Sequence, residues 1–377
     1  RKEGIMRDKK NPERKKGSGQ LDLRVVILAG GSGTRFWPLS RRKNPKQYLN
    51  IIGDKNLIEQ TAARIKGLVP FSRIYTVAIS GQTRRLKKIL PSLPPGNFLI
   101  EPQARNTAPS VLLSTACLYL ENPEAVVAFL PSDHYIKETQ LFRQKLQAAA
   151  QAAYQFKKIV MFGIPPASPA TGYGYLHCPD KNFKTLQKEK FYSVTDFKEK
   201  PDLPTALDFI QSGEYYWNSG LFLWRADVFE DSLRKNTPEL FSAWVKILQA
   251  LKKNDRQQLA RIFRELPAQS IDYALIEKVK GCLMNRGDFG WSDLGSWSSL
   301  GEFLHQDENC IVSRGPVTSL DSRNCLVFNP GQLTALIGLE DLIIVNSKDA
   351  LLVCRREADQ RVKELVEKLG KERPEYT

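Results

Sequence analysis

The chain of 377 residues contains no apolar segment that approaches the roughly 20 residues a membrane-spanning helix needs. Its N-terminus is polar and lacks the apolar stretch of a signal peptide. Histidine is scarce, with three residues, and none of them has the companions of a catalytic triad. The six cysteines show no C-x-x-C spacing, so we expect them to be small core residues in a reducing compartment. These absences predict a soluble, cytoplasmic protein with no membrane partner.

The net charge of +15 is unevenly distributed along the sequence. Residues 1–20 carry eight Lys or Arg against three Asp or Glu and almost no hydrophobic residues, so we expect a disordered basic tail. The remaining positive charge suits a protein whose substrates are phosphates. No helix-turn-helix, zinc-finger or basic aromatic pattern is present. Nucleic-acid binding would therefore rest on charge alone, and we expect no nucleic-acid partner.

A glycine-rich segment follows, and residues 25–48 read VVILAGGSGTRFWPLSRRKNPKQY. The first four residues are typical of a strand buried on both faces of a parallel sheet, and ligands bind at the carboxyl ends of such strands. Glycine backbones can approach a phosphate closely, while Arg35 and Lys46 supply positive charge. The spacing fits neither a Walker loop nor a dinucleotide fingerprint. The glycines alone are also compatible with a flexible turn, but with the strand and the two cations they predict a phosphate site.

The apolar run 125–130 ends in Pro-Ser-Asp-His, which places Asp133 directly after a predicted buried strand. Mg²⁺ prefers one or two carboxylates together with substrate phosphates, so Asp133 is a natural ligand for this ion. Aspartate is also a common turn residue, and this alternative remains open on local grounds. His134 is expected to be a neighbour of the metal rather than a ligand, because Mg²⁺ is a hard cation.

Strand patterns alternate with helical patterns over most of the chain. The strands are expected at 73–80, 97–101 and 125–130, and the helices at 56–67 and 107–120. Repeated β-α units predict an α/β fold with a doubly wound, mostly parallel, Rossmann-like sheet covered on both faces. We assign this catalytic domain to residues 21–304.

From about residue 309 the sequence changes to short apolar pieces separated by Gly, Asn, Asp and Pro. This texture predicts a β-rich module over residues 305–377, either β-solenoid-like or a small sandwich. Alone, such a module would expose strand edges, so we expect it to mediate a homodimer. Apolar residues at 362, 365, 366 and 369 predict a terminal amphipathic helix.

Seven motifs occur in order between about residues 23 and 354: LAGGSGTRFWPLS with NPKQY, EPQARNTAP, PSDH, TGYGY, FKEKP, WNSG and GDFGWSDLGSW. Together they closely resemble the motifs of the sugar-1-phosphate nucleotidylyltransferases, and within that family the mannose-1-phosphate guanylyltransferases. The combination F-W-P-L-S with P-K-Q is far more specific than the glycines. Ala167 stands where the family usually has Thr, but the core of that motif, from Thr171 to Tyr175, is intact.

The resemblance implies a nucleotide site that begins at the end of the first strand. Its implied residues are Leu28, Ala29, Gly30, Gly31, Gly33, Thr34, Arg35, Lys46, Gln47, Arg105 and Asn106. In this interpretation Arg35 holds the departing pyrophosphate and Lys46 holds the α-phosphate. On local grounds Arg105 and Asn106 are also compatible with capping of the helix that follows them.

The resemblance also implies a sugar phosphate site formed by Tyr173, Gly174, Glu199, Lys200 and Asn218. Glu199 would accept hydrogen bonds from sugar hydroxyls, and Lys200 would contact the phosphate of the sugar. Without the resemblance, the adjacent Glu and Lys are equally compatible with a solvated surface pair.

Asp293 matches the second metal aspartate of the family, and Asp288 is a further candidate. The implied cofactor is Mg²⁺ bound by Asp133 and Asp293, which complete a catalytic set with Arg35, Lys46 and Lys200. The expected reaction converts GTP and α-D-mannose 1-phosphate to GDP-mannose and pyrophosphate. The attacking phosphate is already ionised at pH 7, since its second pKa is about 6, so no general base is needed. The alternatives are another hexose or heptose 1-phosphate, another nucleoside triphosphate, or a non-catalytic sugar-nucleotide sensor.

Overall fold

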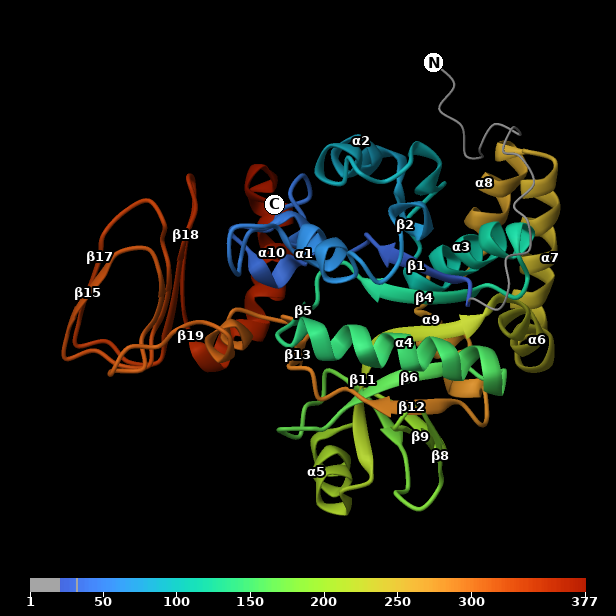
Figure 1. Cartoon of the computed structure of the whole chain (residues 1–377). Helices are drawn as coiled ribbons and strands as arrows, with labels where there is room; N and C mark the ends of the chain where they lie inside the picture. The colour runs from blue at the N-terminus through green and yellow to red at the C-terminus, as the bar shows by residue number, and fades with distance from the viewer. Residues whose placement is uncertain (1–20, 32) are drawn as a thin grey trace. The chain divides into compact units, whose positions relative to one another are not determined.

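The computed structural model describes residues 21–31 and 33–377, and Figure 1 shows the course of the chain. The basic segment 1–20, expected to be a disordered tail, lies outside these described residues. The chain divides into two compact units. Among the described residues, the first comprises 21–30, 61–132 and 136–291, and the second comprises 31–60, 133–135 and 292–377.

A mixed sheet of eleven strands forms the centre of the first unit, with the order β3-β2-β1-β4-β11-β6-β12-β9-β8 and with β7 and β10 attached beside β11. The strands are β1 (Leu23–Leu28), β2 (Ile74–Ile79), β3 (Phe98–Glu101), β4 (Val126–Pro131), β6 (Val160–Ile164), β7 (Gly174–His177), β8 (Phe183–Leu186), β9 (Glu189–Ser193), β10 (Asp196–Glu199), β11 (Tyr215–Arg225) and β12 (Leu283–Arg286). β3, β2, β1 and β4 are mutually parallel, as is β12 to β6, whereas β11 runs antiparallel between β4 and β6. The expected α/β fold with a mostly parallel central sheet is confirmed.

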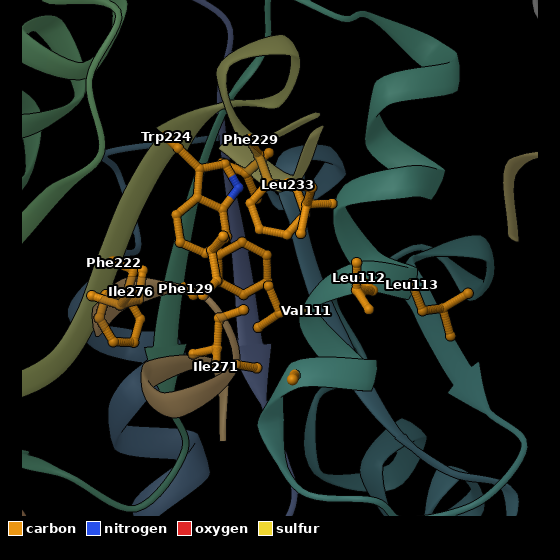
Figure 2. Packing of buried hydrophobic residues seen from close by; sticks show 14 of the residues in the cluster. Val111, Leu112, Leu113, Phe129, Phe222, Trp224, Phe229, Leu233, Ile271 and Ile276 are labelled. Carbon is orange, nitrogen blue, oxygen red and sulfur yellow. The ribbon is translucent and has the colours of Figure 1, made fainter. Parts of the chain in front are cut away.

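Helices cover both faces of this sheet (Figure 1). They are α2 (Ser80–Ile89), α3 (Thr107–Glu121), α4 (Thr139–Phe156), α5 (Leu203–Ser212), α6 (Ala226–Asn236), α7 (Pro238–Lys252), α8 (Arg256–Glu265) and α9 (Ile271–Ala274). On one face Trp224 stacks on Phe229 of α6 at 4.8 Å and packs beside Phe129 at 4.9 Å, as Figure 2 shows. On the other face Phe142 of α4 packs 6.4 Å from Phe162 of β6. Because successive strand residues alternate between the faces, these apolar strands are buried from both sides.

The strand ends on this sheet position the segments that leave it. β1 pairs with β4 from Leu23 opposite Val126 to Leu28 opposite Pro131, so both strands end at the same level. The backbone N–H of Ser132 donates to the carbonyl of Leu28 at 3.2 Å. The chain passes into the second unit just after each of these two strands. The chain also crosses from one unit to the other within three further elements. These are the short strands β5 (Tyr135–Ile136) and β13 (Trp291–Ser292) and the helix α1 (Leu57–Arg64).

The C-terminal part of the second unit is a β-solenoid. One sheet contains β14 (Val312–Arg314), β16 (Leu326–Phe328), β18 (Leu342–Asn346) and β19 (Leu351–Arg355), and the other contains β15 (Val317–Leu320) and β17 (Thr334–Ile337). Parallel pairing of Leu326 with Ile343 and of Val317 with Thr334 gives a coil of 17 residues. Asn346 donates to Asn329, one coil earlier, at 3.1 Å. Of the two architectures expected here, the structure is therefore the solenoid.

A second core in this unit joins the glycine-rich segment to C-terminal residues. The ring of Phe36 packs 4.9 Å from that of Trp297, which in turn lies 5.5 Å from Phe328 of β16. The indole N–H of Trp297 donates to the Trp37 carbonyl at 3.0 Å, and that of Trp37 donates to the Tyr376 carbonyl at 2.8 Å. The compact units thus differ from the expected division at residue 304, because these aromatic contacts draw residues 31–60 into the C-terminal unit.

The helix α10 (Val362–Glu372) continues this second core, as expected from its amphipathic pattern. Val362 is buried there, and α10 packs against the short helix η1 (Thr34–Phe36). Among the residues that the structure describes, no helix has both the length and the apolar composition needed to cross a bilayer.

Candidate functional site

A polar pocket of about 300 Å³ lies entirely within the second unit. It is lined by Gly33, Thr34, Arg35, Phe36, Lys46, Asp133, His134, Asp293, Leu294, Gly295 and Lys363. Four separate segments of the chain contribute to it, among them the glycine-rich segment and α10. The structure therefore brings together the predicted cations Arg35 and Lys46 and the predicted metal ligands Asp133 and Asp293.

Lys46 is the buried centre of this pocket. It starts the short helix η2 (Lys46–Tyr48), and its side chain is only 6% exposed. Its ammonium donates to Asp133 Oδ2 at 2.8 Å and to the backbone carbonyl of Asp293 at 2.6 Å. Lys46 thereby links two aspartates that are 160 positions apart in the sequence.

Electrostatics around Lys46 keep Asp133 ionised. Burial by itself raises the pKa of the Asp133 carboxyl, but the nearby charges of Lys46 and His134 and the Lys46 hydrogen bond outweigh it. The net effect is a pKa below the ordinary aspartate value. Asp133 therefore carries its negative charge at neutral pH and is available to a cation.

Gly33 is required by the close approach of its loop to Lys46. Its φ of 57° lies in the left-handed region, and a Cβ atom at this position would lie 2.1 Å from the Cβ of Lys46. Any other residue would push the loop away from the lysine. Gly31 also has a positive φ, of 98°, but a Cβ there or at Gly30 would meet no atom within 4 Å.

The loop that carries Asp293 has a strained backbone. Leu294 has a φ of 46°, which is uncommon for a residue other than glycine, and its side chain is fully buried in the second core. A Cβ atom on Gly295 would lie 3.1 Å from both carboxylate oxygens of Asp293. Arg35 donates to the Gly295 carbonyl at 3.4 Å. The loop therefore holds Asp293 beside Arg35 and leaves space around its carboxylate.

Several residues assigned to the nucleotide lie outside this pocket. Leu28 and Ala29 belong to the first unit, where the N–H of Ala29 donates to the Val77 carbonyl at 3.1 Å. Gln47 is buried next to Lys46 but does not line the pocket. Asp288, the further metal candidate, pairs instead with Lys145 at 3.1 Å.

Arg105 and Asn106 make structural contacts within the first unit. The side chain of Asn106 accepts the N–H of Thr107 at 2.8 Å and caps α3. Arg105 donates to the Leu266 carbonyl at 2.9 Å. The Asn106 contact fits the capping alternative, whereas the Arg105 contact reaches the end of α8, and nucleotide binding by the two residues stays a prediction.

The predicted sugar-site residues form a second cluster, within the first unit. Glu199 on β10 lies opposite Gly174 on β7, and a Cβ atom on Gly174 would lie 2.3 Å from Glu199 Oε2. The same Cβ would lie 3.5 Å from the Cβ of Asn218. The backbone N–H of Lys200 donates to the Tyr173 carbonyl at 3.1 Å, and the Lys200 ammonium pairs with Glu199. The five residues are therefore neighbours around a position that only glycine can occupy.

Sequence reasoning missed one carboxylate in this cluster, Asp272 at the start of α9. Asp272 Oδ1 accepts a hydrogen bond from Asn218 Nδ2 at 2.7 Å, and Asn218 Oδ1 accepts one from the Gly220 N–H at 3.2 Å. Burial, and then the charge of Glu199, raise the pKa of Asp272. The local sequence SIDYALIEK shows only a helix start, so nothing in it indicates this role. Trp217 and Trp291 were also missed; their rings pack 5.0 and 5.7 Å from that of Tyr173.

Similar known proteins identify the family of the chain. A family model described as nucleotidyl transferase matches residues 24–309, and one described as a MannoseP isomerase/GMP-like beta-helix domain matches 315–369. The chain is 35% identical over 361 residues to the mannose-1-phosphate guanylyltransferase of Escherichia coli, covering 91% of this chain and 75% of the relative. It is 36% identical over 356 residues to the alginate biosynthesis protein AlgA of Pseudomonas putida, covering 92% and 71%. A solved structure from Thermus thermophilus, named as a mannose-1-phosphate geranyltransferase, is similar with a TM-score of 0.82 and 30% identity, covering 93% of this chain and 99% of that one.

Proposed function

Because the chain belongs to the nucleotidyl transferase family, we propose that it transfers a guanylyl group from GTP to α-D-mannose 1-phosphate. The products are GDP-mannose and pyrophosphate. The observation that carries this proposal is the convergence of Arg35, Lys46, Asp133 and Asp293 on one pocket. The identity to relatives named mannose-1-phosphate guanylyltransferase supports the choice of sugar and base.

In the proposed reaction, a phosphate oxygen of mannose 1-phosphate attacks the α-phosphorus of GTP, and the bond to the bridging oxygen breaks. The attacking oxygen is already ionised at neutral pH, because the second pKa of a phosphate monoester is about 6. The residues therefore need to align the phosphates and neutralise their charge rather than remove a proton. Lys46 holds the α-phosphate, and Arg35 holds the pyrophosphate that departs.

The cluster in the first unit binds the sugar phosphate in this proposal. Glu199 and Asn218 have oxygen and nitrogen atoms suited to hydroxyl groups, and Gly174 leaves the space for the ring. Lys200 is more than half exposed, so its ammonium is free to exchange Glu199 for the phosphate of the sugar. Asp272 holds the amide of Asn218 in one orientation.

The donor set in the second unit fits Mg²⁺. Two carboxylates, Asp133 and Asp293, line one pocket, and no group of three or more His, Cys, Asp or Glu side chains suited to a metal occurs in the part of the chain that the structure describes. Mg²⁺ suits such a site, since it takes few protein carboxylates and completes its shell with substrate phosphates and water. When bound, it would neutralise charge that develops on the phosphates.

We also propose a homodimer formed through the C-terminal module. Three apolar side chains are 64–70% exposed on the solenoid, and an apolar surface of this kind favours association. They are Leu320 on β15, Ile337 on β17 and Leu333, which directly precedes β17. Ile337→Glu should convert a dimer to a monomer in light scattering, whereas Val245→Glu, on an exposed site of α7, should not. If both variants run as the wild-type species, the module has no role in assembly.

A cytoplasmic location is likewise a proposal. All six cysteines are unpaired, which supports a reducing compartment. Cys178, Cys282 and Cys325 are buried as expected, whereas Cys117 and Cys354 are partly buried and Cys310 is exposed.

A pyrophosphate-release assay tests the function directly. The purified protein is incubated with each of the four nucleoside triphosphates and a panel of hexose and heptose 1-phosphates. We expect the highest kcat/KM with GTP and mannose 1-phosphate. A higher kcat/KM with another nucleoside triphosphate or sugar 1-phosphate would support the alternative that the enzyme uses that substrate. No pyrophosphate release with any combination would favour a non-catalytic sensor.

A further inference from the structure

We propose that Lys363, on the C-terminal helix α10, binds the β- and γ-phosphates of the nucleotide and then the departing pyrophosphate. Lys363 lines the same pocket as Arg35, Lys46 and the two aspartates. The inference rests on the proposed function and adds a residue that none of the seven sequence motifs contains.

The fold fixes the backbone of Lys363 at the pocket. The preceding residue, Val362, is 3% exposed and belongs to the same core as Phe36 and Trp297. α10 packs against η1, the short helix that contains Arg35. The two cations therefore come from elements that pack together, although they are more than 300 positions apart in the sequence.

The charge of Lys363 contributes little to the stability of its own helix. Lysine in the first turn faces the positive end of the helix dipole, which disfavours it there. Within the described residues its one ion pair is with Glu367, at 3.8 Å, and both side chains are at least 60% exposed. An exposed pair of this type is worth little, so the ammonium can exchange Glu367 for a phosphate.

Charge balance in the pocket leaves room for this role. Lys46 already neutralises Asp133 through a hydrogen bond of 2.8 Å. Arg35 and Lys363 are the two lining cations that make no ion pair with a pocket aspartate among the described residues. A triphosphate carries several negative charges, and two further cations lining the pocket suit the part that leaves.

The experiment uses the full chain and a matched pair of variants, Lys363→Ala and Lys368→Ala. Lys368 lies on the same helix and makes the same type of pair, with Glu372 at 3.8 Å, but it does not line the pocket. Lys363→Ala should raise the KM for GTP, and that for pyrophosphate in the reverse reaction, about 10-fold or more, the loss typical of a hydrogen bond to a charged group. The KM for mannose 1-phosphate should stay within about twofold of the wild-type value, and the melting temperature should stay within about 1 °C. Lys363→Arg should recover part of the loss, because it restores the charge.

Equal kinetics for Lys363→Ala and Lys368→Ala would overturn the inference. Calorimetric titration of inorganic pyrophosphate into the wild type and both variants gives a readout that does not depend on turnover. Weaker pyrophosphate binding by Lys363→Ala alone supports the role of Lys363 even if the wild type proves inactive with GTP and mannose 1-phosphate, a result that would refute only the proposed function.

Discussion

The two pocket aspartates should respond differently to the same substitution. Asp133 contacts Lys46 through its carboxylate, at 2.8 Å, whereas Asp293 contacts it through its backbone carbonyl, at 2.6 Å. Asp133→Asn therefore removes the charge beside a lysine whose side chain is 6% exposed. Asp293→Asn leaves the contact to Lys46 in place. Both substitutions remove one carboxylate from the proposed Mg²⁺ site.

The size of each effect follows from these contacts. A hydrogen bond to a charged group contributes about 1.5–3 kcal/mol, which corresponds to a fall in melting temperature of about 3–12 °C for Asp133→Asn without metal. Asp293→Asn should lower the melting temperature less than Asp133→Asn does, because the Asp293 contact to Lys46 is made by its backbone carbonyl and is kept. Each variant should lose about 10²- to 10³-fold in kcat, typical for one removed electrostatic contact in a catalytic site. The double variant should lose little more, since residues that act as a unit are not additive.

The assay measures kcat for the wild type, both single variants and the double variant over a Mg²⁺ titration. Melting is followed in parallel without metal, and Mg²⁺ binding is measured by calorimetry in the presence of GTP. Near-wild-type turnover and Mg²⁺ affinity in either single variant would remove that residue from the metal site. Equal losses of melting temperature in the two single variants would refute the asymmetry argued from Lys46.

Two further substitutions test one residue beside the proposed sugar site and one beside the phosphate pocket. Asp272→Asn keeps an acceptor for Asn218 but removes a carboxylate whose pKa is raised, so it should raise the melting temperature at pH 7 and also raise the KM for the sugar phosphate. A raised pKa means that the ionised Asp272 carboxylate destabilises the folded protein, and this loss of stability begins as the pH rises above the pKa of aspartate in the unfolded chain. Below about pH 4 the carboxyl is protonated in both states, so the difference in melting temperature should disappear there. A difference that persists at that pH contradicts the argument. Gly33→Ala should cost about 1–3 kcal/mol and about 10² in kcat, because its Cβ would lie 2.1 Å from Lys46 Cβ. Gly53→Ala is the control, with a φ of 68° but no atom within 4 Å, and equal losses in the two variants would show that backbone conformation rather than contact sets the effect.

The parts of the fold that could be predicted are those with a local signature. A continuous apolar run at 25–28 and another at 125–130 indicate buried parallel strands, and the structure contains β1 and β4 at these positions. The short apolar pieces after residue 309 recur about every eight residues because each coil, of 14 or 17 residues, contains two strands. The pairing of a strand with the strand one coil later is a long-range property, so the sequence alone did not exclude a small sandwich.

The parts that could not be predicted depend on contacts between distant segments. Resemblance singled out Phe36 and Trp37 as specific features of the motif, but no local pattern states that they pack against Trp297. Asp272 and Lys363 have the same limitation, since the sequence around Asp272 shows only a helix start and that around Lys363 only ordinary amphipathic spacing. Their roles depend on which residues meet them, at Asn218 and at the pocket.

The hydrogen bond from Trp37 to the Tyr376 carbonyl joins residues 339 positions apart, and it has a consequence for the order of events during synthesis. A ribosome adds about 5–20 residues per second, so roughly 17–70 s separate the appearance of these two partners. During this interval the strands of the first unit can pair, whereas Phe36 and Trp37 do not yet have all of the C-terminal residues that they contact. The nascent chain therefore carries Phe36 and Trp37 without these partners until residue 376 has been synthesised, so the phosphate pocket can be completed only after the central sheet has had time to form.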